Sequence, residues 1–312
     1  GEYGNPYVGT AAGAAYIFTR SGTTWTEQAK LRTSDLATYD VVGTSVHIDD
    51  AANYVAIGAP GEGRQNNFTT SGLGAVYIFN RSGTTWTEQQ KLTSTNVSPI
   101  NNGGQLGHSV YLESGANFVV AGAQTADKSG VSSTGAVYVF TRSGTSWTEQ
   151  AKLNASDLAT FDKFGCTVDI NDNATYIAVG AEGESRTNNF TSSGLGAVYI
   201  FTRSGTTWSQ QTKITGTASS PVNSTGEFGS GVCFDGGANS LVVGAHFSDG
   251  SISNCGAAYV FTRSGTTWTQ QAQLIDDQVT TSTFGNWVRM NKDGSVIAVS
   301  AYQDDGDGAY DR

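Results

Sequence analysis

Residues 74–92 read GAVYIFNRSGTTWTEQQKL, and this stretch decides the fold. An apolar run and a Thr- and Gln-rich run flank the turn residues Ser and Gly, which is the pattern of a β-hairpin. Near-copies of the stretch recur along the chain, and their tryptophans are Trp25, Trp86, Trp147, Trp208 and Trp268. Because these tryptophans stand 61, 61, 61 and 60 residues apart, the chain is built from an internal repeat.

A second pair of short strands separates each hairpin from the next. One example is FGCTVDI from Phe164, followed by TYIAVGA from Thr175. Each unit therefore carries four short strands with turn residues between them, and no stretch shows the period of a helix. Four antiparallel strands in a unit of this length are typical of one blade of a β-propeller. The predicted fold class is all-β.

The two ends of the chain divide one unit between them. Residues 13–31 supply only the hairpin, and residues 284–302 supply only the other pair of strands. A ring explains this division, because the two half blades can pair and close the circle. We therefore predict a single five-bladed β-propeller domain over residues 1–312, with a closing blade shared by the N- and C-terminal strands.

The composition excludes several classes of protein. Only 14% of the residues are charged and the formal net charge is −10, whereas a nucleic-acid-binding surface is basic. No apolar run approaches the roughly 18 residues of a membrane-spanning helix, so no membrane insertion is expected. Three cysteines without a C-x-x-C pair predict neither a disulfide framework nor a zinc site. A sequence rich in Gly, Ser, Thr and Asn predicts an extracellular or cell-surface protein.

A recurring motif marks the strand boundaries. Phe164-Gly165 leads to Gly180-Ala181, and Val42-Gly43 leads to Gly58-Ala59-Pro60. With its equivalents in the other copies, this pattern resembles the FG-GAP repeat, which occurs in the N-terminal propeller of integrin α chains and in many secreted or surface proteins. The resemblance implies a propeller fold and a non-enzymatic binding or adhesion function at the cell surface or outside the cell.

Loops on one side of the propeller are expected to contact a protein or a glycan. Phe68 and Phe190 lie in polar loops of two alternate copies, and Asp35 and Asp157 lie in the loops SDLATYD and SDLATFD of the other two. Since Asp157 and Phe190 each follow their counterpart by 122 positions, the repeat has a longer double unit. These four residues form the predicted binding surface, although Phe68 and Phe190 can equally plug their own loops.

Two alternatives remain for the function. A lectin would carry quasi-repeated carbohydrate sites, and a structural subunit of an extracellular appendage or coat would self-associate. An enzyme is not expected, because His47, His108 and His246 belong to different copies and no nucleophile–base pair is visible. Paired acids of the kind that a glycosidase needs, such as Asp35 with Asp40, recur in alternate copies, whereas a catalytic pair usually breaks the repeat.

Seven N-x-S/T sequons predict a glycoprotein. They are Asn67, Asn80, Asn96, Asn154, Asn173, Asn189 and Asn223. The alternative is that a sequence rich in Asn, Ser and Thr contains them by accident.

Calcium is the only cofactor with any ligand pattern in the sequence. Integrin-like blades hold it in a D-x-D-x-D-G-x-x-D loop, but the closest loop here, residues 169–173, lacks the following Gly and the last acid. The tail residues Asp305, Asp307 and Asp311 have better ligand spacing, although Gln303 replaces the first Asp. Either a weak calcium site or a solvated acidic loop fits this tail.

An arginine precedes every Ser-Gly turn. If Ser21-Gly22 is a two-residue turn, Phe18 faces Trp25 across the hairpin, and Arg20 lies diagonal to Trp25 on the same side and can cover its ring. The alternative is a row of arginines that attracts sulfated or carboxylated glycans.

Overall fold

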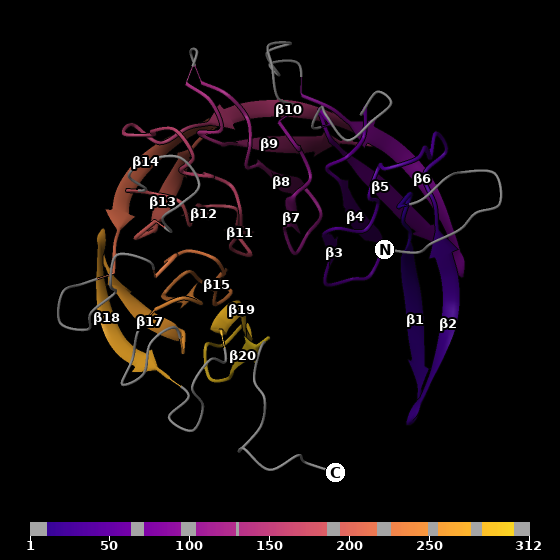
Figure 1. The fold of residues 1–312 in the computed structure, drawn as a ribbon. Coiled ribbons are helices and arrows are strands. Elements are labelled where there is room, and N and C mark those ends of the chain that lie inside the picture. Colours follow the sequence, from indigo (N-terminus) through magenta and orange to yellow (C-terminus); the bar gives the residue numbers. More distant parts are fainter. Residues whose placement is uncertain are drawn as a thin grey trace, which may run out of the picture. The chain divides into compact units, whose positions relative to one another are not determined.

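The computed structural model describes residues 11–63, 72–94, 104–128, 131–185, 194–216, 226–248, 255–275 and 283–302. Every regular element in these ranges is a β-strand, which confirms the predicted all-β class (Figure 1). Within the same ranges, no helix has the length and apolar character needed to cross a membrane. The chain divides into two compact units, residues 1–153 and 154–312, and each is described by itself.

The first unit holds one hairpin and two four-stranded antiparallel sheets. The hairpin consists of β1 (Ala15–Ser21) and β2 (Thr24–Leu31). The first sheet has the order β3 (Val46–Ile48), β4 (Tyr54–Ala59), β5 (Ala75–Ser82) and β6 (Thr85–Leu92). The second has the order β7 (Ser109–Leu112), β8 (Phe118–Ala123), β9 (Ala136–Ser143) and β10 (Ser146–Leu153).

The second unit repeats this plan and ends on a hairpin. One sheet has the order β11 (Val168–Ile170), β12 (Tyr176–Ala181), β13 (Ala197–Ser204) and β14 (Thr207–Ile214). The next has the order β15 (Val232–Phe234), β16 (Ser240–Ala245), β17 (Ala257–Ser264) and β18 (Thr267–Leu274). The last two strands are β19 (Phe284–Met290) and β20 (Ile297–Ala301). The four-stranded sheets are the β-propeller blades predicted from the repeat.

The half blades at the two ends of the chain are two-stranded sheets, β1–β2 and β19–β20. Their bounds agree with the sequence prediction, which placed half blades at residues 13–31 and 284–302. The joining of the two halves into a shared closing blade stays a prediction, as does the single domain over residues 1–312.

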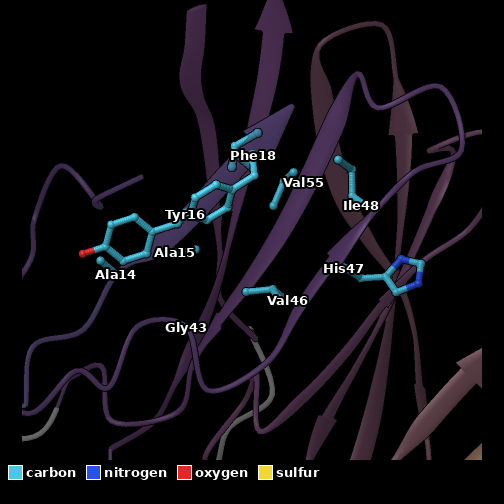
Figure 2. A pocket seen from close by; sticks show the side chains of 10 residues that line it. Ala14, Ala15, Tyr16, Phe18, Gly43, Val46, His47, Ile48 and Val55 are labelled. Carbon is cyan, nitrogen blue, oxygen red and sulfur yellow. The ribbon is translucent and has the colours of Figure 1, made fainter. Parts of the chain in front are cut away.

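An apolar groove of about 480 Å³ is lined by residues of β1, β3 and β4 (Figure 2). Tyr16 and Phe18 of β1 line it, and their exposed fractions are 42% and 54%. The equivalent residues of a complete blade, Tyr77 and Phe79 of β5, are buried because they belong to a cluster that includes Ala15 and Leu31 of the preceding hairpin. Within the described part of the first unit, no hairpin packs on Tyr16 and Phe18 in this way, which leaves the groove beside β1.

The predicted covering of the tryptophan is confirmed, but the predicted turn is shifted by one residue. Ser82 pairs with Thr85, so the two turn residues are Gly83 and Thr84 rather than Ser82 and Gly83. Gly83 adopts a φ of 61°, a left-handed conformation that glycine takes readily. Arg81 pairs with Trp86 across the hairpin, and its guanidinium carbon lies 5.8 Å from the centre of the indole ring. This geometry is that of a cation–π contact.

The arginine at this position also donates hydrogen bonds to other parts of the fold. Arg142 donates from Nε to the carbonyl of Ala116 at 2.6 Å and from Nη1 to the hydroxyl of Tyr54 at 3.1 Å. Tyr54 belongs to β4 of the preceding blade, so the side chain links two blades. These bonds give the recurring arginine a role inside its own protein.

Neighbouring blades touch backbone to backbone at a glycine. A Cβ atom on Gly58 of β4 would lie 1.9 Å from the carbonyl oxygen of Gly107, which precedes β7. A Cβ atom on Gly180 of β12 would lie 2.0 Å from the carbonyl oxygen of Gly229, which precedes β15. The glycine of each of these Gly-Ala pairs is therefore required by close contact rather than by an unusual backbone angle.

This contact predicts a large effect of a single methyl group. Gly58→Ala should lower the free energy of unfolding by about 3 kcal/mol, because the blades must separate to admit the Cβ atom. Gly83→Ala is the matched control. It has open space around its Cβ position and should lose only about 1 kcal/mol for its left-handed conformation. Urea titration of both variants measures the difference, and equal losses would contradict the contact argument.

Candidate functional site

The structure describes only part of the residues that the sequence singled out. Asp35 and Asp157 lie within the described ranges, in the loops that precede β3 and β11. The predicted residues that lie outside the described ranges are Phe68, Phe190, the sequons Asn67, Asn96, Asn189 and Asn223, and the tail acids Asp305, Asp307 and Asp311.

The loop after β11, which the sequence weighed as a calcium loop, is closed by its own hydrogen bonds. Asn171 is buried, and its side-chain oxygen accepts the backbone N–H groups of Thr175 and Tyr176, both at 2.8 Å. Among the described residues, no group of three or more His, Cys, Asp or Glu is placed to hold a metal ion.

Asp35 belongs to a compact polar cluster in the first unit. Its carboxylate accepts a hydrogen bond from the Tyr77 hydroxyl at 2.7 Å and pairs with the Lys91 ammonium at 2.7 Å. Lys91 also pairs with Glu62 at 2.7 Å. The four groups come from the loop before β3, the segment after β4, β5 and β6, so they tie a loop to the blade.

The second unit contains the same cluster 122 positions later. The Asp157 carboxylate accepts the Tyr199 hydroxyl at 2.9 Å and pairs with Lys213 at 2.7 Å. Lys213 pairs with Glu184 at 2.7 Å and lines a hollow of about 210 Å³ together with Glu184 and Leu195. The double unit seen in the sequence therefore builds the same cluster twice, and binding of a partner there stays a prediction.

The charges of these clusters follow from their contacts. Burial acts to raise the pKa of Asp35, but the hydrogen bonds from Lys91 and Tyr77 outweigh it and hold that pKa below its usual value. Burial raises the pKa of the Tyr77 hydroxyl, and the bond to Asp35 adds to this rise, so the tyrosine stays a donor. In the second unit, burial raises the pKa of Asp162, in the same loop as Asp157, to about 6.

The repeat supplies an internal test of the tyrosine bond. Tyr138 is the equivalent of Tyr77 in the next blade, and its buried hydroxyl has no hydrogen-bond partner among the described residues. Tyr77→Phe should lower the free energy of unfolding by about 1 kcal/mol, since it removes a hydrogen bond to a carboxylate that is partly exposed. Tyr138→Phe should be neutral or stabilising. Thermal unfolding of the two variants tests this contrast, which is lost if both behave alike.

A second set of polar side-chain pairs lies at one end of the blades, where the first strand of a blade begins and its second strand ends. The residue before the Phe-Gly motif faces the residue after the Gly-Ala motif of the same blade. In the blade of β7 and β8, Gln124 donates to Gln105 at 3.3 Å. In the blade of β11 and β12, Lys163 pairs with Glu182 at 2.6 Å. In the blade of β15 and β16, Glu227 and His246 stand 3.3 Å apart.

The pairs of the second unit place four titratable groups together. We call Lys163, Glu182, Glu227 and His246 the Lys–Glu–Glu–His site. Lys163 is within electrostatic range of both glutamates, and His246 is within range of Glu182 and Lys163. The exposed fraction of the Lys163 side chain is 31%, whereas that of Glu227 is 9%. Unlike the duplicated clusters, this site breaks the repeat.

Burial sets the protonation states at the Lys–Glu–Glu–His site. Desolvation lowers the pKa of His246, an effect that the charge of Glu182 only partly offsets, so the imidazole is neutral at pH 7. Burial acts to lower the pKa of Lys163, but the charge and hydrogen bond of Glu182 raise it above its usual value. The site thus combines a neutral base with a permanent cation.

The backbone holds two of these residues in an unusual conformation. Lys163 has a φ of 56° and Glu227 a φ of 49°, in the left-handed region that side chains other than glycine rarely adopt. The equivalent residues Val41, Gln105 and Thr283 have φ values of 56°, 56° and 48°. Since all five copies share the conformation, the fold imposes it, and in three of them the side chain meets the residue after Gly-Ala.

The sequence reasoning missed this site. It treated His246 as isolated because the other histidines fall in other copies. The useful signal was positional, since aligning the copies shows that the residue before Phe-Gly and the residue after Gly-Ala vary together in polarity. They are Val and Pro in one copy, Gln and Gln in the next, then Lys with Glu and Glu with His.

The family model of the FG-GAP repeat matches residues 25–79, 147–201 and 208–261, which is more than half of the chain. The chain belongs to the FG-GAP repeat family. This confirms the resemblance drawn from the Phe-Gly and Gly-Ala motifs. No curated protein sequence matches the chain.

Solved structures similar to this FG-GAP propeller have very different sequences. The periplasmic gluconolactonase of Pseudomonas aeruginosa has a TM-score of 0.57 and 9% sequence identity, and the match covers 91% of this chain and 70% of that one. A protein from Lactobacillus plantarum has a TM-score of 0.48 and 11% identity, over 87% of this chain and 66% of that one. The first similarity shows a shared fold, and the second is too low to add to it.

The comparison corrects the functional prediction. The sequence reasoning took the FG-GAP propeller to be a non-enzymatic binding or adhesion protein, with a lectin or a self-assembling subunit as alternatives, and excluded an enzyme. A propeller of the same fold is a gluconolactonase, so the fold gives no ground for excluding catalysis. The exclusion also rested on the absence of a nucleophile–base pair and on histidines that lie in different copies. The structure places Glu227 3.3 Å from His246, so this histidine has a carboxylate partner from its own copy. We therefore do not retain the non-enzymatic prediction.

Proposed function

We propose that the protein is a hydrolase of ester or lactone bonds in a small molecule. The observation that carries the proposal is the Glu227–His246 pair beside the Lys163–Glu182 pair. Hydrolysis of an ester requires a base for water, a positive charge for the oxyanion and an acid for the leaving alkoxide. The four side chains offer all three.

Glu227 prepares His246 as the base. Its carboxylate lies 3.3 Å from Nε2 of the imidazole and assigns the ring proton to that nitrogen, which leaves Nδ1 as the proton acceptor. Nδ1 is buried and has no hydrogen-bond partner among the described residues. The ring of Phe247 lies 4.2 Å from the imidazole between centres, and the proposal requires that Nδ1 become accessible to water.

Lys163 supplies the positive charge. Its ammonium carries a charge throughout the neutral range, because the pKa is raised by Glu182, and nearly a third of its side chain is exposed. An ammonium beside the carbonyl oxygen of a substrate stabilises the charge that develops in the transition state.

The reaction balances with water as the only co-reactant. Water attacks the carbonyl carbon while its proton passes to Nδ1 of His246. The carbon–oxygen bond of the tetrahedral intermediate then breaks, and the imidazolium returns the proton to the leaving alkoxide. The products are a carboxylic acid and an alcohol, which remain one molecule when the substrate is a lactone. The gluconolactonase of similar fold supports testing a sugar lactone first.

The proposal predicts loss of hydrolysis on removal of the base. His246→Gln should lower kcat/KM for D-glucono-1,5-lactone at least about 100-fold, the usual contribution of a general base. His108→Gln is the matched control, because His108 stands next to the neutral Gln105–Gln124 pair. A pH-stat assay of acid release measures both variants. The assignment fails if they lose activity equally, or if Lys213→Met in the second cluster abolishes activity while His246→Gln does not.

We also propose, as the sequence suggests, that the protein is extracellular and glycosylated. The support is the exposed position of Asn173, in the turn between β11 and β12. Asn80 is half-buried within β5, where it pairs with Tyr54.

Expression in a glycosylating secretory host should therefore add a glycan at Asn173 and none at Asn80. Peptide mass spectrometry before and after glycosidase treatment measures both sites. An unmodified Asn173 in protein secreted by that host would contradict the assignment.

A further inference from the structure

In both units, a side chain on the first strand of one blade accepts a hydrogen bond from the first strand of the next blade. In the first unit, Nδ1 of His47 in β3 accepts the backbone N–H of Leu112 in β7 at 3.3 Å. In the second unit, Sγ of Cys233 in β15 accepts the N–H of Met290 in β19 at 3.3 Å. Such a side chain replaces the ladder hydrogen bond that two strands of different sheets do not make.

Asp169 of β11 makes the shortest of these bridges. Its Oδ2 accepts the backbone N–H of Phe234 in β15 at 2.6 Å. The strands β11 and β15 lie side by side in Figure 1 and are in contact. The side chain is 1% exposed, and Oδ1 is buried without a hydrogen-bond partner among the described residues. A carboxyl group with one unpaired oxygen in a dry setting is unusual.

The surroundings of Asp169 favour its protonated form. The titratable and charged groups that face it are Cys233 of β15 and Arg289 of β19. Burial raises the pKa of Asp169 to about 7. The Phe234 N–H, the charge of Arg289, the Ile170 N–H and the Cys233 thiol oppose the rise without cancelling it. The Cys233 thiol adds no charge, because burial first, and then the charge of Asp169, raise its pKa to about 12.

The bridge joins the two halves of the Lys–Glu–Glu–His site. Lys163 and Glu182 flank β11 and β12, whereas Glu227 and His246 flank β15 and β16. The spacing between the ammonium and the imidazole therefore depends on how β11 sits against β15. Asp169 lies at the contact of these two strands.

We propose that Asp169 is a positioning residue for the Lys–Glu–Glu–His site, and that its neutral, buried carboxyl group, which bridges β11 and β15, holds together the two blades that carry the site. The proposal rests on the hydrolase function proposed above. An ionised carboxylate at this depth requires hydration, so loss of the proton admits water between β11 and β15 and separates the ammonium from the imidazole.

The sign of the pH effect follows from the two protonation states. The ordinary pKa of an Asp carboxyl is 3.8, and the pKa of Asp169 in the folded protein is about 7. Between these values the folded state holds a proton that the unfolded state has released, so the contribution of Asp169 to stability falls as pH rises through this window. Relative to Asp169→Asn, the unfolding constant of the wild type should rise up to about tenfold per pH unit until pH 7 and level off above it.

The pH dependence of activity distinguishes a positioning role of Asp169 from a purely structural role. Wild-type kcat/KM for D-glucono-1,5-lactone should fall above pH 7 as Asp169 ionises, whereas Asp169→Asn should keep its activity at alkaline pH. On the acid side, both proteins should lose activity only below the usual imidazole pKa of 6.5, because the pKa of His246 is lowered. The proposal is overturned if Asp169→Asn retains the alkaline loss of the wild type.

Two measurements separate this proposal from the hydrolase function. Infrared spectroscopy should show a carboxylic-acid carbonyl band at pH 6 that disappears by pH 8 and is absent from Asp169→Asn. Hydrogen exchange, corrected for intrinsic rates, should show that protection of the Phe234 amide drops above pH 7 in the wild type alone. If no lactone is hydrolysed while both results hold, the hydrolase proposal fails and the proton-dependent bridge stands. Absence of the band, or protection that does not change with pH, refutes the bridge.

Discussion

Contact between the backbones of neighbouring blades is the constraint on which the other features depend. The glycine of the Gly-Ala pair lies against the carbonyl oxygen of the glycine in the next Phe-Gly pair, with no room for a Cβ atom. This contact fixes where each first strand begins and each second strand ends. The residues before Phe-Gly and after Gly-Ala are consequently brought together in each blade that shows the pair. The geometry of the Lys–Glu–Glu–His site is thus a consequence of blade packing.

The sequence predicted the blades well because a repeat states the same information several times. The strand pairs, the place of each hairpin turn to within one residue, and the arginine over the tryptophan follow from local patterns that recur with small changes. The candidate site could not be predicted in the same way, because it depends on what differs between copies. Glu227 and His246 are 19 positions apart, and their proximity becomes visible only when the register of β15 and β16 is known. Asp169 also looked like a failed calcium ligand, since no local pattern shows that its carboxylate reaches another blade.

Repeated and unrepeated charges have different roles in this protein. The two copies of the Asp–Lys–Glu–Tyr cluster use nearly the same distances, and most of their polar groups satisfy one another. Such clusters hold loops against blades. The Lys–Glu–Glu–His site leaves a neutral imidazole nitrogen unpaired among the described residues. Such an atom lowers stability, so we expect it where it has a function. Comparing copies within one chain therefore distinguishes polar groups that maintain the fold from groups that are available for chemistry.

The left-handed residue before each Phe-Gly motif has a consequence for how such a protein can acquire new chemistry. Its conformation is the same whether the side chain is Val, Gln, Lys, Glu or Thr, so the backbone does not have to be redesigned when the side chain changes. Each blade with this pair offers two rigid backbone positions whose side chains can be exchanged independently. A duplicated propeller of this kind can gain, lose or relocate a reactive pair by two substitutions while its framework continues to fold.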